Sequence, residues 1–203
     1  VGVTPLVLVV HAEKVPAKTI PEFIAYLKAN PGKLAYGSSG VGSSLHIAME
    51  LFLQKTDTKM LHVPYKGSAP MMTDLIGGQV DVMFNGMVAT YPQVKAGKIK
   101  LIAISSTQRN AQMPGTPTVA ESLPGFLTGS FQGLLAPAGT PKAVVDKLHA
   151  EIQRIAAIPE IKERLTALGA EPSAMTPDQF AQWMRAEIPA MAKIVKDEKI
   201  TVE

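Results

Sequence analysis

The segment YGSSGVGSS, residues 36–44, consists almost entirely of glycines and serines. Glycines let a ligand approach the backbone closely, hydroxyls donate hydrogen bonds, and the free N–H groups at a helix start attract anions. An apolar stretch precedes the segment, and the residues after it repeat apolar side chains at helical spacing: Leu45, Ala48, Met49 and Phe52. The segment therefore predicts a strand–loop–helix connection that binds a carboxylate or a phosphate. A flexible connection with a helix cap is the alternative interpretation.

Three known loop motifs do not fit this segment. A P-loop requires a lysine that is absent here, and a Rossmann fingerprint requires a glycine where Leu45 stands. A nucleophile elbow requires a glycine where Val41 stands. The predicted contacts are therefore backbone and hydroxyl groups, from Gly37, Ser38, Ser39, Gly40, Gly42 and Ser43.

Two other predicted strands end in polar residues. The strand expected over 60–65 ends at Tyr65 and is followed by Gly67 and Ser68 at a helix start, and the strand expected over 80–85 ends in Asn85. Ligands bind at the carboxyl ends of strands in open α/β sheets. We therefore expect these residues to share one edge with the serines of the loop.

The titratable residues predict no catalytic centre. The four histidines lie on different predicted elements, and only His46 with Glu50 has an i, i+4 spacing, which favours a pair on a helix surface over a metal site. Neither a Ser/His/Asp set nor paired carboxylates can be recognised. The sequence therefore predicts no catalytic residue, no metal site and no cofactor.

Short apolar runs alternate with amphipathic stretches along the first two thirds of the chain. Helix starts are expected at Thr19, at Thr140–Pro141 and at Thr176. The alternation is typical of an α/β protein with parallel, right-handed βαβ units. Strands are expected over 5–10, 33–37, 60–65, 80–85, 98–106 and 130–137.

After Pro137 the pattern is almost wholly helical, with one further strand expected over 200–202. Val145, Leu148 and Ile152 form part of an apolar helix face that needs a surface to cover it. We therefore expect this chain to be the C-terminal part of a longer protein. The alternative is that the late helices pack on one another or on the back of the sheet.

Composition narrows the class of partner. The chain has 203 residues, of which 46% are hydrophobic, 18% charged and 5% aromatic, with scattered lysines and arginines and a net charge of +3. Scattered charge and few aromatic residues argue against a nucleic-acid surface. The chain has no cysteine, which excludes disulfides and thiolate metal sites, and no apolar run of the length a membrane span needs.

The chain resembles the substrate-binding receptors of tripartite tricarboxylate transporters, also called Bug receptors, over nearly its whole length. The matching stretches are PGKLAYGSSGVGSSLHIAMELF (31–52), HVPYKGSAPMMTDLIGGQVDVMFN (62–85), VKAGKIKLIAISS (94–106), PTVAESLPGF (117–126) and GLLAPAGTP (133–141).

This resemblance implies an α/β protein of the periplasmic binding protein type II class, with two lobes that close on a ligand like a Venus flytrap. It implies that residues 6–130 form the second lobe, with half of the cleft, and that residues 1–5 and 131–203 form the hinge and the helical part of the first lobe. The opening part of the first lobe would be missing from this chain.

The resemblance also implies a set of ligand-binding residues: Gly37, Ser38, Ser39, Gly40, Gly42, Ser43, Tyr65, Lys66, Ser68, Asn85 and Phe131. Many relatives have an aspartate where Asn85 stands and a tryptophan where Phe131 stands. An amide cannot supply the charge that pairs with a ligand ammonium. We therefore expect a di- or tricarboxylate or an aromatic carboxylate, and not an amino acid.

The function implied is that of a periplasmic solute-binding receptor, not an enzyme, that delivers its carboxylate to integral-membrane permease subunits. A ligand sensor that acts on a signalling partner and an enzyme on the same α/β plan are the alternatives. Self-association through the surface left open by the missing part is also expected.

Overall fold

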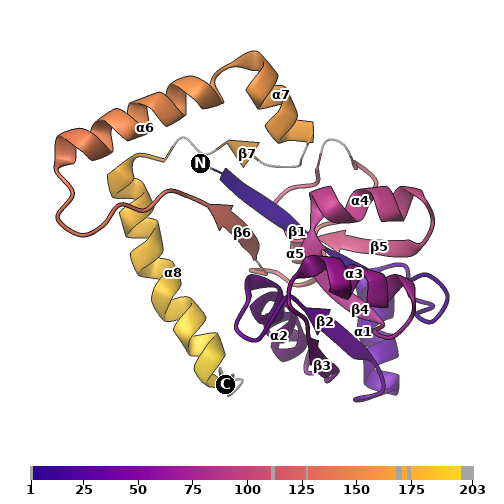
Figure 1. The fold of residues 1–203 in the computed structure, drawn as a ribbon. Coiled ribbons are helices and arrows are strands. Elements are labelled where there is room, and N and C mark those ends of the chain that lie inside the picture. Colours follow the sequence, from indigo (N-terminus) through magenta and orange to yellow (C-terminus); the bar gives the residue numbers. More distant parts are fainter. Residues whose placement is uncertain (1, 111–112, 127, 168–170, 173–174, 198–203) are drawn as a thin grey trace.

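The computed structural model describes residues 2–110, 113–126, 128–167, 171–172 and 175–197 (Figure 1). Its main sheet has the strand order β3-β2-β4-β1-β5. These strands are β1 (Gly2–His11), β2 (Ala35–Ser38), β3 (Leu61–Pro64), β4 (Val82–Gly86) and β5 (Ile99–Ile104). The mixed α/β class and the first five predicted strands are confirmed.

The direction of β1 differs from the prediction of parallel βαβ units. β2 is parallel to β3 and β4, but β1 is antiparallel to β4 and to β5. The reason is that β1 enters the sheet where the other strands end, since Leu6 faces Gly86 at the end of β4. Only the strands joined by crossover helices within this sheet obey the βαβ rule.

Five helices accompany these strands: α1 (Ile20–Ala29), α2 (Ser44–Thr56), α3 (Ser68–Ile76), α4 (Met87–Lys95) and the short α5 (Val119–Ser122). The predicted cap at Thr19 is confirmed, because its side chain accepts a hydrogen bond from the Glu22 N–H. β1, β4, α2 and their neighbours enclose one apolar core that includes Phe52, Phe84 and Phe126.

The first residues of β1 belong to a second, smaller sheet. Gly2–Pro5 pair with β6 (Gly129–Gln132), and Gly2 and Val3 also pair with β7 (Glu171–Pro172). The strand expected over 130–137 ends at Gln132, because residues 133–137 form no ladder. β7 was not predicted, and the strand expected over 200–202 lies outside the described residues.

The last third of the chain carries α6 (Lys142–Ala156), α7 (Pro159–Ala167) and α8 (Pro177–Asp197). The cap of α6 is Pro141, one residue later than predicted. The predicted cap at Thr176 is confirmed by reciprocal hydrogen bonds with Gln179.

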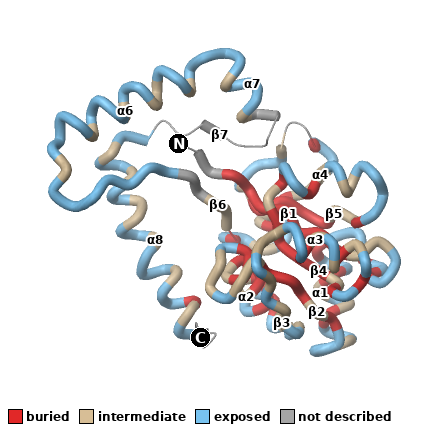
Figure 2. Tube along the Cα trace, in the orientation of Figure 1, coloured by how far each residue is buried: buried red, intermediate tan, exposed pale blue. Residues whose placement is uncertain are grey.

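These helices bury few side chains. Among the described side chains beyond residue 132, Ile194 alone is buried, and Figure 2 shows α6 and α7 projecting away from the buried core. α8 runs back towards α2, which it contacts. The apolar face of α6 remains open, with Leu148 51% exposed.

Candidate functional site

The glycine- and serine-rich segment joins β2 to α2, as predicted. β2 ends at Ser38, and Ser43 caps α2 by accepting a hydrogen bond from the His46 N–H at 3.3 Å. Gly40 and Gly42 have φ angles of 133° and 73°, which side-chain-bearing residues rarely adopt. We define residues Ser39–Ser43 as the anion loop, because it presents backbone and hydroxyl groups at a helix N-terminus.

Three strand ends meet beside this loop, as the sequence predicted. In the β2–β3 ladder Ser38 faces Pro64, and the Tyr65 N–H donates to the Ser38 carbonyl at 2.9 Å. In the β2–β4 ladder Gly37 faces Met83, so Asn85 at the end of β4 lies at the same edge of the sheet. This edge is therefore polar, although the strands that reach it are apolar.

Asn85 carries a buried donor that has no partner among the described residues. Its side chain is 3% exposed, and its Nδ2 makes no hydrogen bond within the described part of the chain. An unsatisfied buried amide costs about 1–3 kcal/mol. Such a donor is typical of a position at which an external acceptor binds.

Thr128 has a similar hydroxyl, which sequence reasoning missed. Its Oγ1 is buried without a described partner, while its carbonyl accepts a hydrogen bond from Ser105 Oγ at 2.6 Å. Ser105 Oγ in turn accepts from the Leu6 N–H at 2.8 Å, next to Val7, which pairs with Asn85. No spacing pattern marks Thr128, because its placement depends on the non-local pairing of β1.

The loop after β3 supplies Tyr65, Lys66 and Ser68. The Tyr65 hydroxyl donates to Asp74 Oδ2 at 2.8 Å. Burial, together with the hydrogen bond and charge of Asp74, raises the pKa of Tyr65 to about 12, so the phenol stays protonated. Lys66 is exposed, and Ser68 is the first residue of α3, whose N-cap Gly67 has no side chain to cap it.

Ser38 and Phe131 take positions that the sequence did not specify. Ser38 is fully buried, and its Oγ lies 2.7 Å from His62 Nε2 and 3.2 Å from the Gly40 nitrogen. Ser38 therefore stabilises this conformation of the anion loop by accepting a hydrogen bond from the Gly40 N–H. Phe131 pairs through its backbone with Val3, and its side chain lies outside the described ones.

His46 and Glu50 do not form the predicted pair on a helix surface, because His46 is only 4% exposed. Its ring stacks on His62 with the centroids 3.9 Å apart, and His62 stacks in turn on Tyr36 at 4.8 Å. Glu50 Oε1 lies 3.6 Å from His46 Nε2 and accepts a hydrogen bond from the Tyr36 hydroxyl. The i, i+4 spacing of His46 and Glu50 can be read from the sequence. The stacking of His62 from β3 on His46 cannot.

Burial and neighbours shift two pKa values in this cluster. Burial, followed by the nearby His46, lowers the pKa of His62 to about 4, against an opposing effect of Glu50. Burial alone would raise the pKa of Glu50, but hydrogen bonds from His46 and Tyr36 outweigh it and lower that pKa. Near neutral pH the cluster therefore combines an uncharged His62 with a charged Glu50.

The first residue of α2, next to the anion loop, contacts the small sheet. Ser44 Oγ on α2 lies 3.2 Å from Ser130 Oγ on β6. Ser130 is a second polar residue that sequence reasoning placed in a strand without assigning it to the site.

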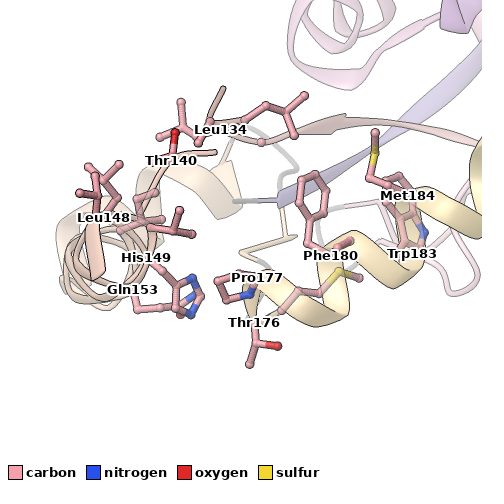
Figure 3. Close-up of a pocket in the computed structure, with 18 of the residues that line it drawn as sticks. Leu134, Thr140, Leu148, His149, Gln153, Thr176, Pro177, Phe180, Trp183 and Met184 are labelled. Atoms are coloured by element: carbon pink, nitrogen blue, oxygen red, sulfur yellow. The ribbon is translucent and has the colours of Figure 1, made fainter. Parts of the chain in front are cut away.

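A separate apolar groove of about 710 Å³ lies between α6 and α8 (Figure 3). Leu148 and His149 of α6 and Phe180 and Trp183 of α8 line it, together with the segment after β6. None of the predicted ligand-binding residues lines this groove. Its apolar lining suits packing against protein better than binding of a small anion.

The described residues contain no helix long and apolar enough to cross a membrane. Within the same residues, no group of three or more His, Asp or Glu side chains is arranged to hold a metal ion.

Three proteins of known structure are similar to this chain. One is Rpa4515 of R. palustris with adipate, with a TM-score of 0.89 at 32% identity over 99% of this chain and 67% of that one. The periplasmic binding protein BugD gives 0.86 at 33% identity over 100% and 69%. MatC (Rpa3494) from Rhodopseudomonas palustris with bound malate gives 0.84 at 32% over 96% and 67%.

The sequence comparisons agree with the structural ones. Curated relatives such as BugT of Bordetella pertussis are 33% to 39% identical to this chain, which spans about 60% of their length. Residues 1–200 match the family described as the tripartite tricarboxylate transporter family receptor. The chain therefore belongs to the tripartite tricarboxylate transporter receptor family, and it has the fold of periplasmic binding proteins.

Proposed function

We propose that this chain carries half of the ligand cleft of a periplasmic receptor, which binds a small organic carboxylate and delivers it to permease subunits in the membrane. The observation that carries this proposal is the buried Nδ2 of Asn85, which has no hydrogen-bond partner among the described residues and lies at the sheet edge where β2 ends and the anion loop begins. A carboxylate oxygen is the kind of acceptor that such a donor lacks.

The anion loop and the residues next to it would bind the ligand together. The hydroxyls of Ser39 and Ser43 lie at the N-terminus of α2, where negative charge is favoured. The N–H groups of Gly40 and Gly42 donate to Ser38 Oγ and His46 Nδ1, so these two glycines would let the ligand approach the backbone closely. The remaining predicted contacts come from the loop after β3, with Tyr65, Lys66 and Ser68, and from Phe131 on β6.

A ligand without an amino group fits this site best. Adipate and malate, found in the two Rhodopseudomonas proteins, are dicarboxylates. Asn85 offers a neutral donor, so a ligand ammonium at this position would lack a countercharge. Di- or tricarboxylates are therefore the first candidates, and aromatic carboxylates the second.

The two sheets support a division into lobes. Leu6–His11 of β1 lie in the main sheet, whereas Gly2–Pro5 pair with β6 and β7. Residues 6–130 would form one lobe, and residues 1–5 and 131–203 would be the hinge and part of the other. The apolar groove between α6 and α8 would then lie against the rest of that lobe.

Isothermal titration calorimetry of the full chain with adipate and malate tests the proposal. We expect binding of at least one of them, weaker binding of glutamate, and at least a tenfold loss of affinity in Asn85→Leu. Thr73→Ala, at an exposed position of α3, is the matched control and should bind as the wild type does. The proposal fails if none of the carboxylates binds or if the protein converts them to products.

A further inference from the structure

The stacked histidines His46 and His62 contact Gly42 of the anion loop and the neighbouring Ser38. We propose that they are positioning residues. The hydrogen bonds that their ring nitrogens make with Gly42 and Ser38 hold the loop in its ligand-binding conformation. This inference rests on the proposed function and adds to it two residues that do not touch the ligand themselves.

The His46 side of the pair holds one end of the loop. The Gly42 N–H donates to His46 Nδ1 at 3.0 Å. Nδ1 can accept this bond only without a proton of its own, so the ring proton lies on Nε2, which faces Glu50. A second proton on the ring would turn Nδ1 into a donor and remove the bond to Gly42.

The His62 side holds the other end. His62 Nε2 lies 2.7 Å from Ser38 Oγ, and the Gly40 N–H reaches the same oxygen at 3.2 Å. The two bonds therefore anchor Gly40 and Gly42, the two residues of the loop with positive φ angles. Without side chains, these glycines would otherwise leave the loop many accessible conformations.

Stacking couples the two anchors. The ring centroids are only 3.9 Å apart, so a positive charge on His46 disfavours one on His62. The polar groups that face the pair are Glu50 on α2 and Tyr36 and Ser38 on β2. Glu50 is the charged group among them, and it faces His46 Nε2, opposite the nitrogen that Gly42 uses.

Nuclear magnetic resonance of the ¹⁵N-labelled full chain reads the loop directly. In His46→Leu we expect the Gly42 amide to exchange with solvent at least tenfold faster, and in His46→Asn, whose side-chain oxygen can replace Nδ1, we expect this change to be largely reversed. His62→Phe keeps the stack but loses the bond to Ser38, so it should loosen Gly40, whereas His62→Gln should restore it.

Binding of adipate and malate to the same variants then tests whether the conformation of the loop affects affinity. We expect at least a tenfold higher Kd in His46→Leu and less than a threefold change in His46→Asn. If His46→Leu does not fold, His46→Phe replaces it, because phenylalanine keeps a ring on His62 but has no nitrogen to accept from the Gly42 N–H.

The outcomes separate this inference from the proposed function. Unchanged Gly40 and Gly42 amides in the Leu and Phe variants would overturn the positioning role even if carboxylates bind. If the amides respond as expected but the wild type binds neither carboxylate, the loop anchoring stands, and both the proposed ligand class and the link from loop to binding fall.

Discussion

The imidazole rings of His46 and His62 lie face to face, with centroids 3.9 Å apart and planes inclined by 9°. They connect the first turn of α2 to β3 beneath the anion loop. Burial disfavours the charged form of His62, so protonation of this ring is tied to the stability of the fold.

Acid should therefore destabilise the protein through His62. Its pKa is about 4 in the folded state and about 6.5 when unfolded, so the unfolded chain binds more protons between these values. The free energy of unfolding should fall by roughly 1–2 kcal/mol as the pH drops from 6.5 to 4, allowing for the partial exposure of the ring. Urea denaturation across this range measures it, and His62→Phe should flatten the profile.

Glu50 acts in a lower pH window. Its folded-state pKa is lowered, so the stability that it contributes is present above the unfolded value of 4.5 and is lost as the pH falls further. Removing its donor in Tyr36→Phe should cost about 1.5–3 kcal/mol, because the bond involves a charged acceptor. Tyr91→Phe on α4 is the control and should change stability by less than ~0.5 kcal/mol. Equal urea midpoints for the two variants would contradict this prediction.

Local sequence patterns predicted where helices begin, whereas the arrangement of the site depends on contacts between elements far apart in the sequence. Thr19 and Thr176 cap helices as their sequence spacing indicates, because capping involves only neighbouring residues. The direction of β1 and the burial of His46 depend on partners on other elements, which periodicity does not reveal. Sequence reasoning therefore located the anion loop but missed the histidines beneath it.

Asn85→Leu should separate binding from stability. The replacement removes a buried donor that has no described partner, so stability should stay the same or rise by up to about 1–2 kcal/mol. A residue that served only the core would not combine this result with a loss of carboxylate affinity. Chemical denaturation beside calorimetry of the same samples measures both. A destabilised variant would show that the amide is satisfied in solution.

Gly42 and Gly32 form a matched pair, with φ angles of 73° and 69°. An added methyl group should strain the backbone similarly at both positions, by about 1–2 kcal/mol, and at Gly32 it meets open space. Thermal denaturation should therefore give similar losses for Gly42→Ala and Gly32→Ala, but only Gly42→Ala should weaken adipate or malate binding. Equal affinities in the two variants would exclude the anion loop from the ligand contacts.

The apolar groove predicts how the 203-residue chain behaves in solution. Leu148 on the α6 face is 51% exposed beside a groove of about 710 Å³, and exposed apolar surface of this kind drives association. Light scattering should therefore show a mass above 21.6 kDa that rises with concentration. Leu148→Glu should shift the chain towards the monomer, because a charge in the groove opposes its burial.

The control for this experiment is Val88→Glu on α4, which is 44% exposed and does not line the groove. It adds the same charge to the chain, so any general effect of charge on association appears in both variants. If both variants associate as the wild type does, the contact between copies lies elsewhere on the surface. A wild-type monomer at all concentrations would mean that the face formed by α6 and α8 is stable when exposed to water. The proposal that this groove packs against the rest of the first lobe would then lose its support.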